Sequence, residues 1–124
     1  MTLVLIAVGG AVGALSRYLL QGWVQQLTGD RFPWGTFAVN ISGSFLLGVV
    51  FALAVDRAIL APEVRVPVMI GFIGSYTTFS TLMLESWRMV EEGDYLFMLG
   101  NLVGSAVVGM VAVVAGLAIG RLLP

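Results

Sequence analysis

The 124-residue sequence contains no cysteine, no histidine and no lysine. Without cysteine there are no disulfides and no thiolate metal sites, and without histidine there are no imidazole metal ligands or imidazole proton relays. Charged residues make up 10% of the chain, whereas a soluble domain carries roughly a quarter. The formal net charge of -1 provides no basic surface for nucleic acid. So few charges cannot cover a water-soluble surface, and most of this surface must face lipid.

Hydrophobic residues make up 59% of the chain and gather in four long runs. Each run approaches or exceeds the roughly 20 helical residues that cross a bilayer. The runs are continuously apolar and lack the alternating polarity of a membrane β-barrel, so they predict helices. The first run has no basic residue before it, and we expect it to be a retained helix rather than a cleaved signal peptide. The prediction is an all-α membrane protein with one four-helix transmembrane domain over residues 1–124, and the spans are Leu3–Val24, Phe37–Val55, Val66–Val90 and Tyr95–Leu123.

The six arginines are divided almost evenly between the two sides of such a bundle. Four crossings place Arg57, Arg65 and Arg121 on one side. The other side receives Arg31 and Arg88, with Arg17 toward the end of the first helix. Arginine excess normally marks the cytoplasmic side. The balance leaves two interpretations open: noise in a small count, or insertion in both orientations.

Glycine is abundant, at 16 residues, and several glycines are spaced by four. Small residues at this spacing allow helix backbones to approach closely in lipid. The pattern predicts tight helix packing, and it includes the pairs Gly9 and Gly13, Gly100 and Gly104, and Gly116 and Gly120.

Polar side chains in a bilayer core are costly and usually face protein or water. Each predicted helix carries them at helical spacing: Arg17 and Gln21, Asn40 and Ser44, the segment 75–85, and Asn101 and Ser105. Serine and threonine can instead bond back to their own helix, an asparagine can join two helices, and an arginine can extend to the membrane surface. For each single residue, a functional role and such a structural role both stay open.

The segment Ser75–Ser80 is unusual because five of its six side chains carry hydroxyls, and Gly71 and Gly74 precede it. Glycine and β-branched residues disfavour a continuous helix. We therefore expect the third helix to break near the middle of the bilayer. Freed carbonyls at that depth suit a small hard cation. Glu85 lies about two turns further on, either near a water-filled mouth or paired with Arg88.

Three segments resemble the signatures of the small fluoride channels, the Fluc or CrcB family. They are residues 9–18 (GGAVGALSRY), 35–45 (GTFAVNISGSF) and 71–81 (GFIGSYTTFST). The resemblance covers nearly the whole chain in the expected order, and the third segment is the most diagnostic.

This resemblance implies an antiparallel, dual-topology dimer with two fluoride pathways and a structural sodium ion at its centre. We expect a homodimer, with a heterodimer of paralogues as the alternative. Gly74 and Thr77 would supply carbonyls to the sodium ion. The fluoride pathway would comprise Arg17 at the vestibule, Asn40, the ring edge of Phe79 and the hydroxyls of Ser80 and Thr81, to which we add Glu85 and Ser105.

One position departs from the family pattern. The family usually has a second phenylalanine three residues after the first, and this chain has Leu82 there. Leucine keeps the bulk but has no polarised ring edge. The difference predicts a modified pore or a subunit that requires a paralogous partner.

These features together predict a passive, fluoride-selective channel that exports fluoride across the cell membrane. No nucleotide-binding loop or catalytic constellation appears in the sequence, so we do not expect an enzyme. One rival is a small four-helix, proton-coupled multidrug exporter, which would want a glutamate in the first helix, where this chain has none. The other rival is a non-transporting membrane assembly subunit, which would explain the glycines but not the hydroxyl cluster.

Overall fold

The computed structural model describes residues 1–124, which form helices joined by short connections. The first span is α1 (Thr2–Thr28), and the second is α2 (Trp34–Phe51) continued by the π-helix η1 (Ala52–Asp56). The third span consists of α3 (Pro62–Val66), the π-helix η2 (Pro67–Ile73), α4 (Gly74–Tyr76) and α5 (Phe79–Glu91), and the fourth is α6 (Tyr95–Leu122). All four are long and apolar enough to cross a membrane, which confirms the predicted multi-pass helical protein.

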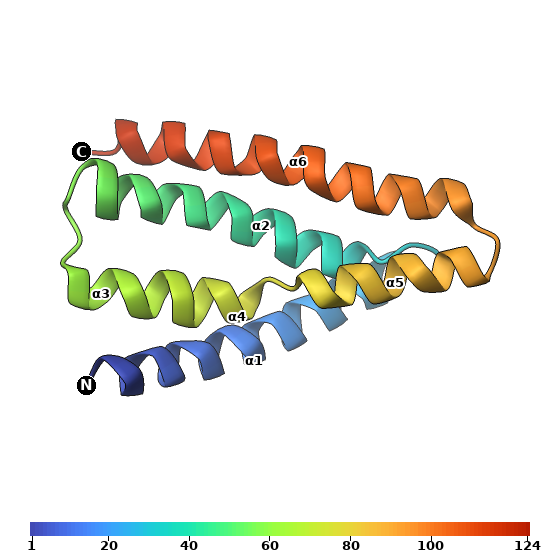
Figure 1. Cartoon of the computed structure of the whole chain (residues 1–124), viewed down its shortest axis with the longest axis horizontal. Helices are drawn as coiled ribbons and strands as arrows, with labels where there is room; N and C mark the ends of the chain where they lie inside the picture. Colours follow the sequence, from blue (N-terminus) through green and yellow to red (C-terminus); the bar gives the residue numbers. More distant parts are fainter.

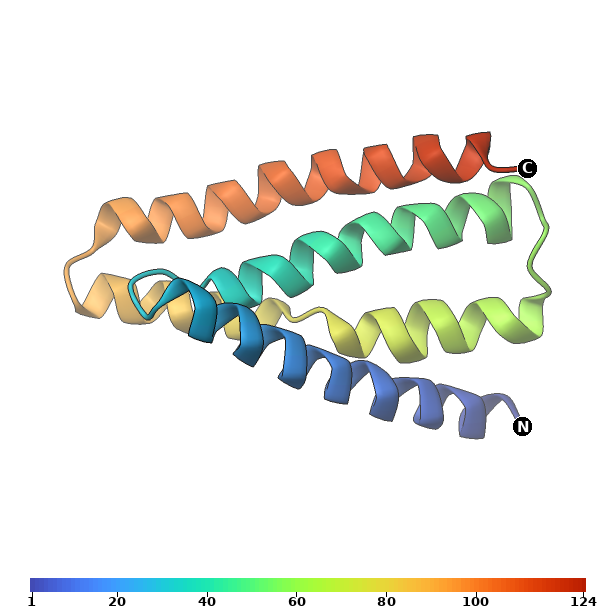
Figure 2. The ribbon, with the colours of Figure 1, turned by 180° about the vertical axis from the view of Figure 1, so that it is seen from behind.

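The four spans run antiparallel to their neighbours in sequence, so both termini lie at one end of the molecule (Figure 1). We call this end, with the connection between η1 and α3, the terminal end. The connections α1–α2 and α5–α6 lie at the opposite end, which we call the loop end. The most extensive packing joins α2 to α6 and α1 to η2. Seen from behind, α1 crosses in front of the third span (Figure 2).

Glycines bring these helix pairs into backbone contact. A Cβ atom added to Gly13 would overlap the carbonyl oxygen of Phe72 in η2, and one added to Gly116 would overlap that of Phe45 in α2. Gly9 and Gly120 pack in the same way against Pro67 and Val49. In contrast, nothing lies within 4 Å of the added atom at Gly100 or Gly104. The predicted close packing therefore holds within the chain for two of the three pairs.

The π-helical turns of η2 begin at a proline inside the third span. Pro67 has no N–H to donate, and its ring would clash with the carbonyl four residues earlier in a regular α-helix. Wider π turns occur as local insertions in helices and change the hydrogen-bond register. The third span thus changes its helical register before it reaches the serine- and threonine-rich segment.

The interior of this bundle is unusually polar. The largest fully buried side chains are Val39, Asn101 and Thr36, so two of the three are polar. Large apolar side chains such as Leu3, Leu96 and Leu122 are more than four-fifths exposed. This distribution is the inverse of a soluble domain, and it suits a protein whose outer solvent is lipid.

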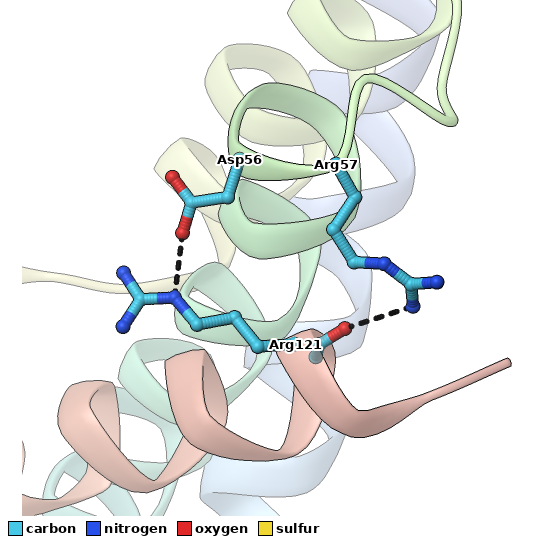
Figure 3. Close-up of polar contacts among 4 residues, drawn as sticks. Asp56, Arg57 and Arg121 are labelled. Atoms are coloured by element: carbon cyan, nitrogen blue, oxygen red, sulfur yellow. Dashed lines mark hydrogen bonds and ion pairs between the residues drawn. The ribbon is translucent and has the colours of Figure 1, made fainter.

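The two ends of the bundle differ in composition. All three tryptophans lie toward the loop end, where Phe32 stacks obliquely on Trp34 at 4.7 Å and the Arg31 guanidinium lies 5.5 Å from the Phe97 ring centre. At the terminal end, Arg121 pairs with Asp56 at 2.7 Å (Figure 3). Arg57 donates to the carbonyls of Gly120 and Leu123, and these contacts join η1 to the last turn of α6.

Candidate functional site

Two residues interrupt the helical path of the third span. Thr77 (φ -88°, ψ 157°) and Thr78 (φ -148°, ψ 112°) are extended, whereas α4 ends at Tyr76 and α5 begins at Phe79. The Thr78 hydroxyl caps α5 by accepting from the Thr81 N–H at 3.3 Å. The residue composition that predicted an interruption therefore coincides with two non-helical residues, and their depth in a bilayer stays a prediction.

Asn40 of α2 holds the second of these residues by its backbone. The Asn40 side-chain oxygen accepts from the Thr78 N–H at 2.7 Å, and its Nδ2 donates to the Thr78 carbonyl at 3.0 Å. Two further α2 residues border the same connection. Ser42 shares a 2.8 Å hydrogen bond with the Tyr76 hydroxyl, and Gly43 leaves no room for a Cβ beside Thr77. The α2 segment 40–43 therefore acts as a template for the extended backbone.

This arrangement diverts two helical hydrogen bonds. In a continuous α-helix the N–H of residue 78 would donate to the carbonyl of Gly74, and the N–H of residue 81 to that of Thr77. Here the first N–H donates to Asn40 and the second to the Thr78 hydroxyl. The carbonyls of Gly74 and Thr77, the two predicted to bind sodium, thus lose their helical donors. Gly74 is also exposed, and its nearest neighbour for an added Cβ is 3.6 Å away.

A cavity of about 360 Å³ lies beside the interruption, between the second, third and fourth spans. It brings together three of the predicted pathway residues: Asn40, Phe79 and Ser105. Leu82, the position of the missing second phenylalanine, also lines it and is 8% exposed. The Ser105 hydroxyl oxygen is buried and has no hydrogen-bond partner within the chain. The walls are mostly apolar and carry a few convergent polar groups.

A second cavity, of about 530 Å³, opens at the loop end and includes Glu85 among its lining residues. A chain of hydrogen bonds leads into it across three helices: Gln21 donates to Thr36 at 3.0 Å, and Thr36 donates to Glu85 at 2.6 Å. The considered pairing of Glu85 with Arg88 is wrong for this structure, because the Glu85 carboxylate is bound by Thr36 and the only ion pair joins Asp56 to Arg121.

Thr77 also lines the smaller cavity, whereas the other predicted residues lie outside the walls of both cavities. Ser80 is exposed, and Thr81 accepts a 2.9 Å hydrogen bond from the Thr78 hydroxyl. Arg17 is half-buried, and its buried Nε has no partner within the chain. Ser80, Thr81 and Gly74 thus lie close to the interruption, and Arg17 lies in α1. None of these four residues lines either cavity.

The sequence reasoning missed the cross-helix partners of the polar residues. Thr36 links Gln21 to Glu85, but the second span was expected to begin after it, at Phe37. The buried amide of Asn101 donates to Ser86 at 3.0 Å, and Ser86 was not singled out. The available signal was a hydroxyl within a mostly apolar run, which identifies a polar residue but not its partner.

Comparisons with known proteins give one consistent result. A family model described as "CrcB-like protein, Camphor Resistance (CrcB)" matches residues 4–117. A protein of Hahella chejuensis named fluoride-specific ion channel FluC is 46% identical over 98% of this chain and 95% of its own length. A protein of Solidesulfovibrio magneticus, also named fluoride-specific ion channel FluC, is 46% identical over 95% of this chain and 94% of its own length. A protein of Symbiobacterium thermophilum named fluoride-specific ion channel FluC 1 is 47% identical over 97% of this chain and 98% of its own length.

Proposed function

This chain belongs to the CrcB family, and on that premise we propose that it is a fluoride-specific ion channel that lets fluoride leave the cell passively. The relatives are named ion channels rather than enzymes, exporters or assembly subunits, so the rival functions are not favoured. The multidrug exporter is also disfavoured by the first span, which has no acidic residue. A negative cell interior would drive the anion outward across the cell membrane without an energy source.

The observation that carries the proposal is the cavity beside the interruption. Fluoride is small and strongly hydrated, so a pore must replace its water with hydrogen-bond donors. Asn40 and Ser105 offer an amide N–H and a hydroxyl in this cavity, and Phe79 can offer the positive edge of its ring. None of the three carries a fixed positive charge, so the anion would not be trapped. Conduction requires binding that is weak enough for release.

We extend the pathway along the polar residues on either side of this cavity. Thr81 and Ser80 continue a hydroxyl track from Thr78. Glu85 and Arg17 would lie toward the aqueous vestibule, where the larger cavity opens. In this arrangement, the donors of the smaller cavity select the anion, and the larger cavity connects the pathway to the aqueous solution.

We propose an antiparallel homodimer, with a paralogue as the alternative partner. Two features of the single chain support this arrangement. The arginines are balanced between the two ends, and all the tryptophans lie toward the loop end. Membrane proteins usually have aromatic side chains at both interfaces. Two copies in opposite orientations would place such residues at each interface.

A sodium ion at the dimer centre is the proposed cation. The carbonyls of Gly74 and Thr77 fit this role chemically, because their helical donors are diverted and hard cations prefer oxygen ligands. When bound, the ion would supply positive charge between the two interruptions and hold the subunits together. Asn40 and the Thr78 hydroxyl are the groups of this chain that leave both carbonyls available.

The test is fluoride release from liposomes that contain the purified protein, measured with a fluoride electrode. The wild type should release fluoride, whereas Asn40→Asp should release almost none. Two like charges 4 Å apart at an effective dielectric of about 20 repel by about 4 kcal/mol, or roughly a thousandfold in occupancy. Asp also lacks the N–H that donates to the Thr78 carbonyl.

Gln26→Glu is the matched control, because it makes the same chemical change at an exposed position outside both cavities. It should retain wild-type release, and size-exclusion chromatography should find both variants assembled. Wild-type release from assembled Asn40→Asp would show that the pathway does not pass Asn40. A wild type that releases no fluoride would overturn the proposed function.

A further inference from the structure

The side-chain amide of Asn40 belongs to both parts of the candidate site. A primary amide has two N–H donors and one carbonyl acceptor. One donor and the acceptor are bound to the backbone of Thr78. Asn40 also lines the smaller cavity, and its second N–H has no partner within the chain. One planar group therefore connects the interruption to the cavity.

The backbone of Thr78 determines which way this amide faces. If the oxygen and nitrogen exchanged places, the amide oxygen would oppose the Thr78 carbonyl and the NH₂ group would oppose the Thr78 N–H. Both contacts would then be repulsive, and Thr78 is only 7% exposed, so water cannot readily replace them. The free N–H of Asn40 is thus held in one direction rather than sampling two.

The same bond also determines the state of the Gly74 carbonyl. The Thr78 N–H is the donor that a continuous helix would give to Gly74, and Asn40 accepts it at 2.7 Å. Ser42 and Gly43, on the next turn of α2, fit against Tyr76 and Thr77. They stabilise the neighbouring residues but do not accept this N–H. Among these α2 residues, only Asn40 accepts the N–H that a continuous helix would give to Gly74.

We propose that Asn40 is a positioning residue for the cation as well as a donor to the anion. By accepting the Thr78 N–H it keeps the Gly74 carbonyl free for a hard cation, and by the same orientation it offers its second N–H to the cavity. The identity of the two ions, sodium and fluoride, rests on the proposed function. The inference couples cation binding and anion conduction through one amide.

Two near-isosteric substitutions separate these roles. Asn40→Asp keeps an oxygen for the Thr78 N–H, and this charge-assisted bond, about twice as strong as a neutral one, should outweigh the repulsion between its second oxygen and the Thr78 carbonyl. Cation binding should therefore survive, whereas the loss of both donors should abolish fluoride release. Asn40→Leu keeps the approximate volume but loses the acceptor, so both should be lost. Ser44→Ala is the control for cation binding, since Ser44 lies one turn away and its hydroxyl bonds only to its own helix. Asn40→Ala replaces Asn40→Leu if the latter does not fold.

The measurement is the melting temperature of the purified protein in sodium chloride and in potassium chloride of equal ionic strength, with fluoride release assayed on the same samples. Sodium in about hundredfold excess over its dissociation constant should raise the melting temperature of wild type, Asn40→Asp and Ser44→Ala by roughly 4 °C or more. Asn40→Leu should change by less than about 1 °C, because a ligand that does not bind the folded state does not stabilise it.

Sodium stabilisation of Asn40→Leu equal to that of wild type would overturn the inference, and so would a wild type that does not respond to sodium. In both cases, fluoride release by the wild type would leave the proposed channel function standing. Conversely, a wild type that is stabilised by sodium through Asn40 but releases no fluoride would support the positioning role and refute the channel. The two failures are therefore distinguishable.

Discussion

Phe79 and Leu82 lie about one turn apart at the start of α5, and both line the smaller cavity. Their exposure differs, because Phe79 is 73% exposed and Leu82 is 8% exposed. A large ring that is exposed in the single chain can be covered by lipid, by a second subunit or in part by a passing ion. In the proposed antiparallel dimer, the ring would complete a wall that the single subunit leaves open.

Replacing Phe79 with isoleucine tests the role of the ring edge. Isoleucine keeps much of the apolar volume but has no quadrupole, so it cannot stabilise an anion with a positive edge. We expect Phe79→Ile to lower fluoride release from liposomes by roughly tenfold while the protein still assembles. Release at the wild-type rate would indicate that Phe79 only fills space.

Leu82→Phe tests the position where the chain departs from the family pattern. Leu82 borders a cavity of about 360 Å³, so the larger ring has room beside it. The ring would add a second positive edge facing the anion. Fluoride release should be unchanged or increased, and the variant should assemble as well as wild type. A loss of release from an assembled variant would show that this cavity requires leucine.

For single residues, the sequence predicted which polar side chains lie within the apolar spans better than it predicted what those side chains contact. Asn40 stands out because lipid cannot satisfy an amide, and the family resemblance then implied that it faces the fluoride pathway. Its partner could not be predicted, because the Thr78 backbone group becomes available only when the third span is interrupted beside α2. The partner of Glu85 was missed for the same reason, since Thr36 approaches it only in the folded bundle.

Among the elements, the third span differs most from a regular helix. It combines a proline start, π-helical turns and two extended threonines before α5 begins. Its first part packs closely on α1 through glycines, and the segment around Tyr76 and Thr77 rests on α2. The interruption is therefore supported by two neighbouring helices as well as by local hydrogen bonds such as the Thr78 cap.

Close glycine packing predicts a difference between two glycines of α6. An alanine at Gly116 would overlap the Phe45 carbonyl and force α2 and α6 apart, whereas an alanine at Gly100 meets nothing within 4 Å. Gly116→Ala should lower the free energy of unfolding by about 1–3 kcal/mol, as overpacking usually does. Gly100→Ala should leave it unchanged or raise it by up to about 1 kcal/mol through helix propensity. Chemical unfolding in detergent, followed by circular dichroism, would measure both. Equal stability of the two variants would contradict the packing described here.

The sequence predicted the four spans because length and hydropathy alone decide whether a helix can cross a membrane. The boundaries were less accurate. The second span begins at Trp34 rather than Phe37, and the third begins at Pro62 rather than Val66. Proline at the first turn favours a helix start although it is not strongly apolar. The π-helical register was not predicted, because it depends on how the chain accommodates Pro67 in the folded bundle.

The whole molecule has two different ends. The loop end carries the three tryptophans and the larger cavity, and the terminal end carries the Asp56–Arg121 ion pair. Neither end has a clear excess of arginine. The usual signal that fixes orientation during insertion is therefore weak, which is what the proposed dual topology requires.

A reporter fused after residue 124 tests this balance. Reporters that are active on only one side of the membrane should give a signal on both sides, because copies insert in both orientations. Replacing Ala58 and Ile59, in the connection between η1 and α3, with arginine should move nearly all copies to one orientation, with that end in the cytoplasm. A reporter of the unaltered chain found on a single side in all copies would contradict the antiparallel dimer.

The packing of α2 against α6 also has a consequence for how the protein is made. These partners are the second and fourth spans to leave the ribosome, so α2 enters the membrane before the helix that its glycine contacts require. At about 5–20 residues per second, several seconds separate the two events. Until the third span follows, Asn40 and Thr36 lack their partners Thr78 and Glu85, and lipid cannot satisfy their polar groups. Until α6 follows, the face of α2 that packs on Gly116 also lacks its partner. We expect the nascent three-span chain to be the species that membrane insertases shield and quality-control proteases remove.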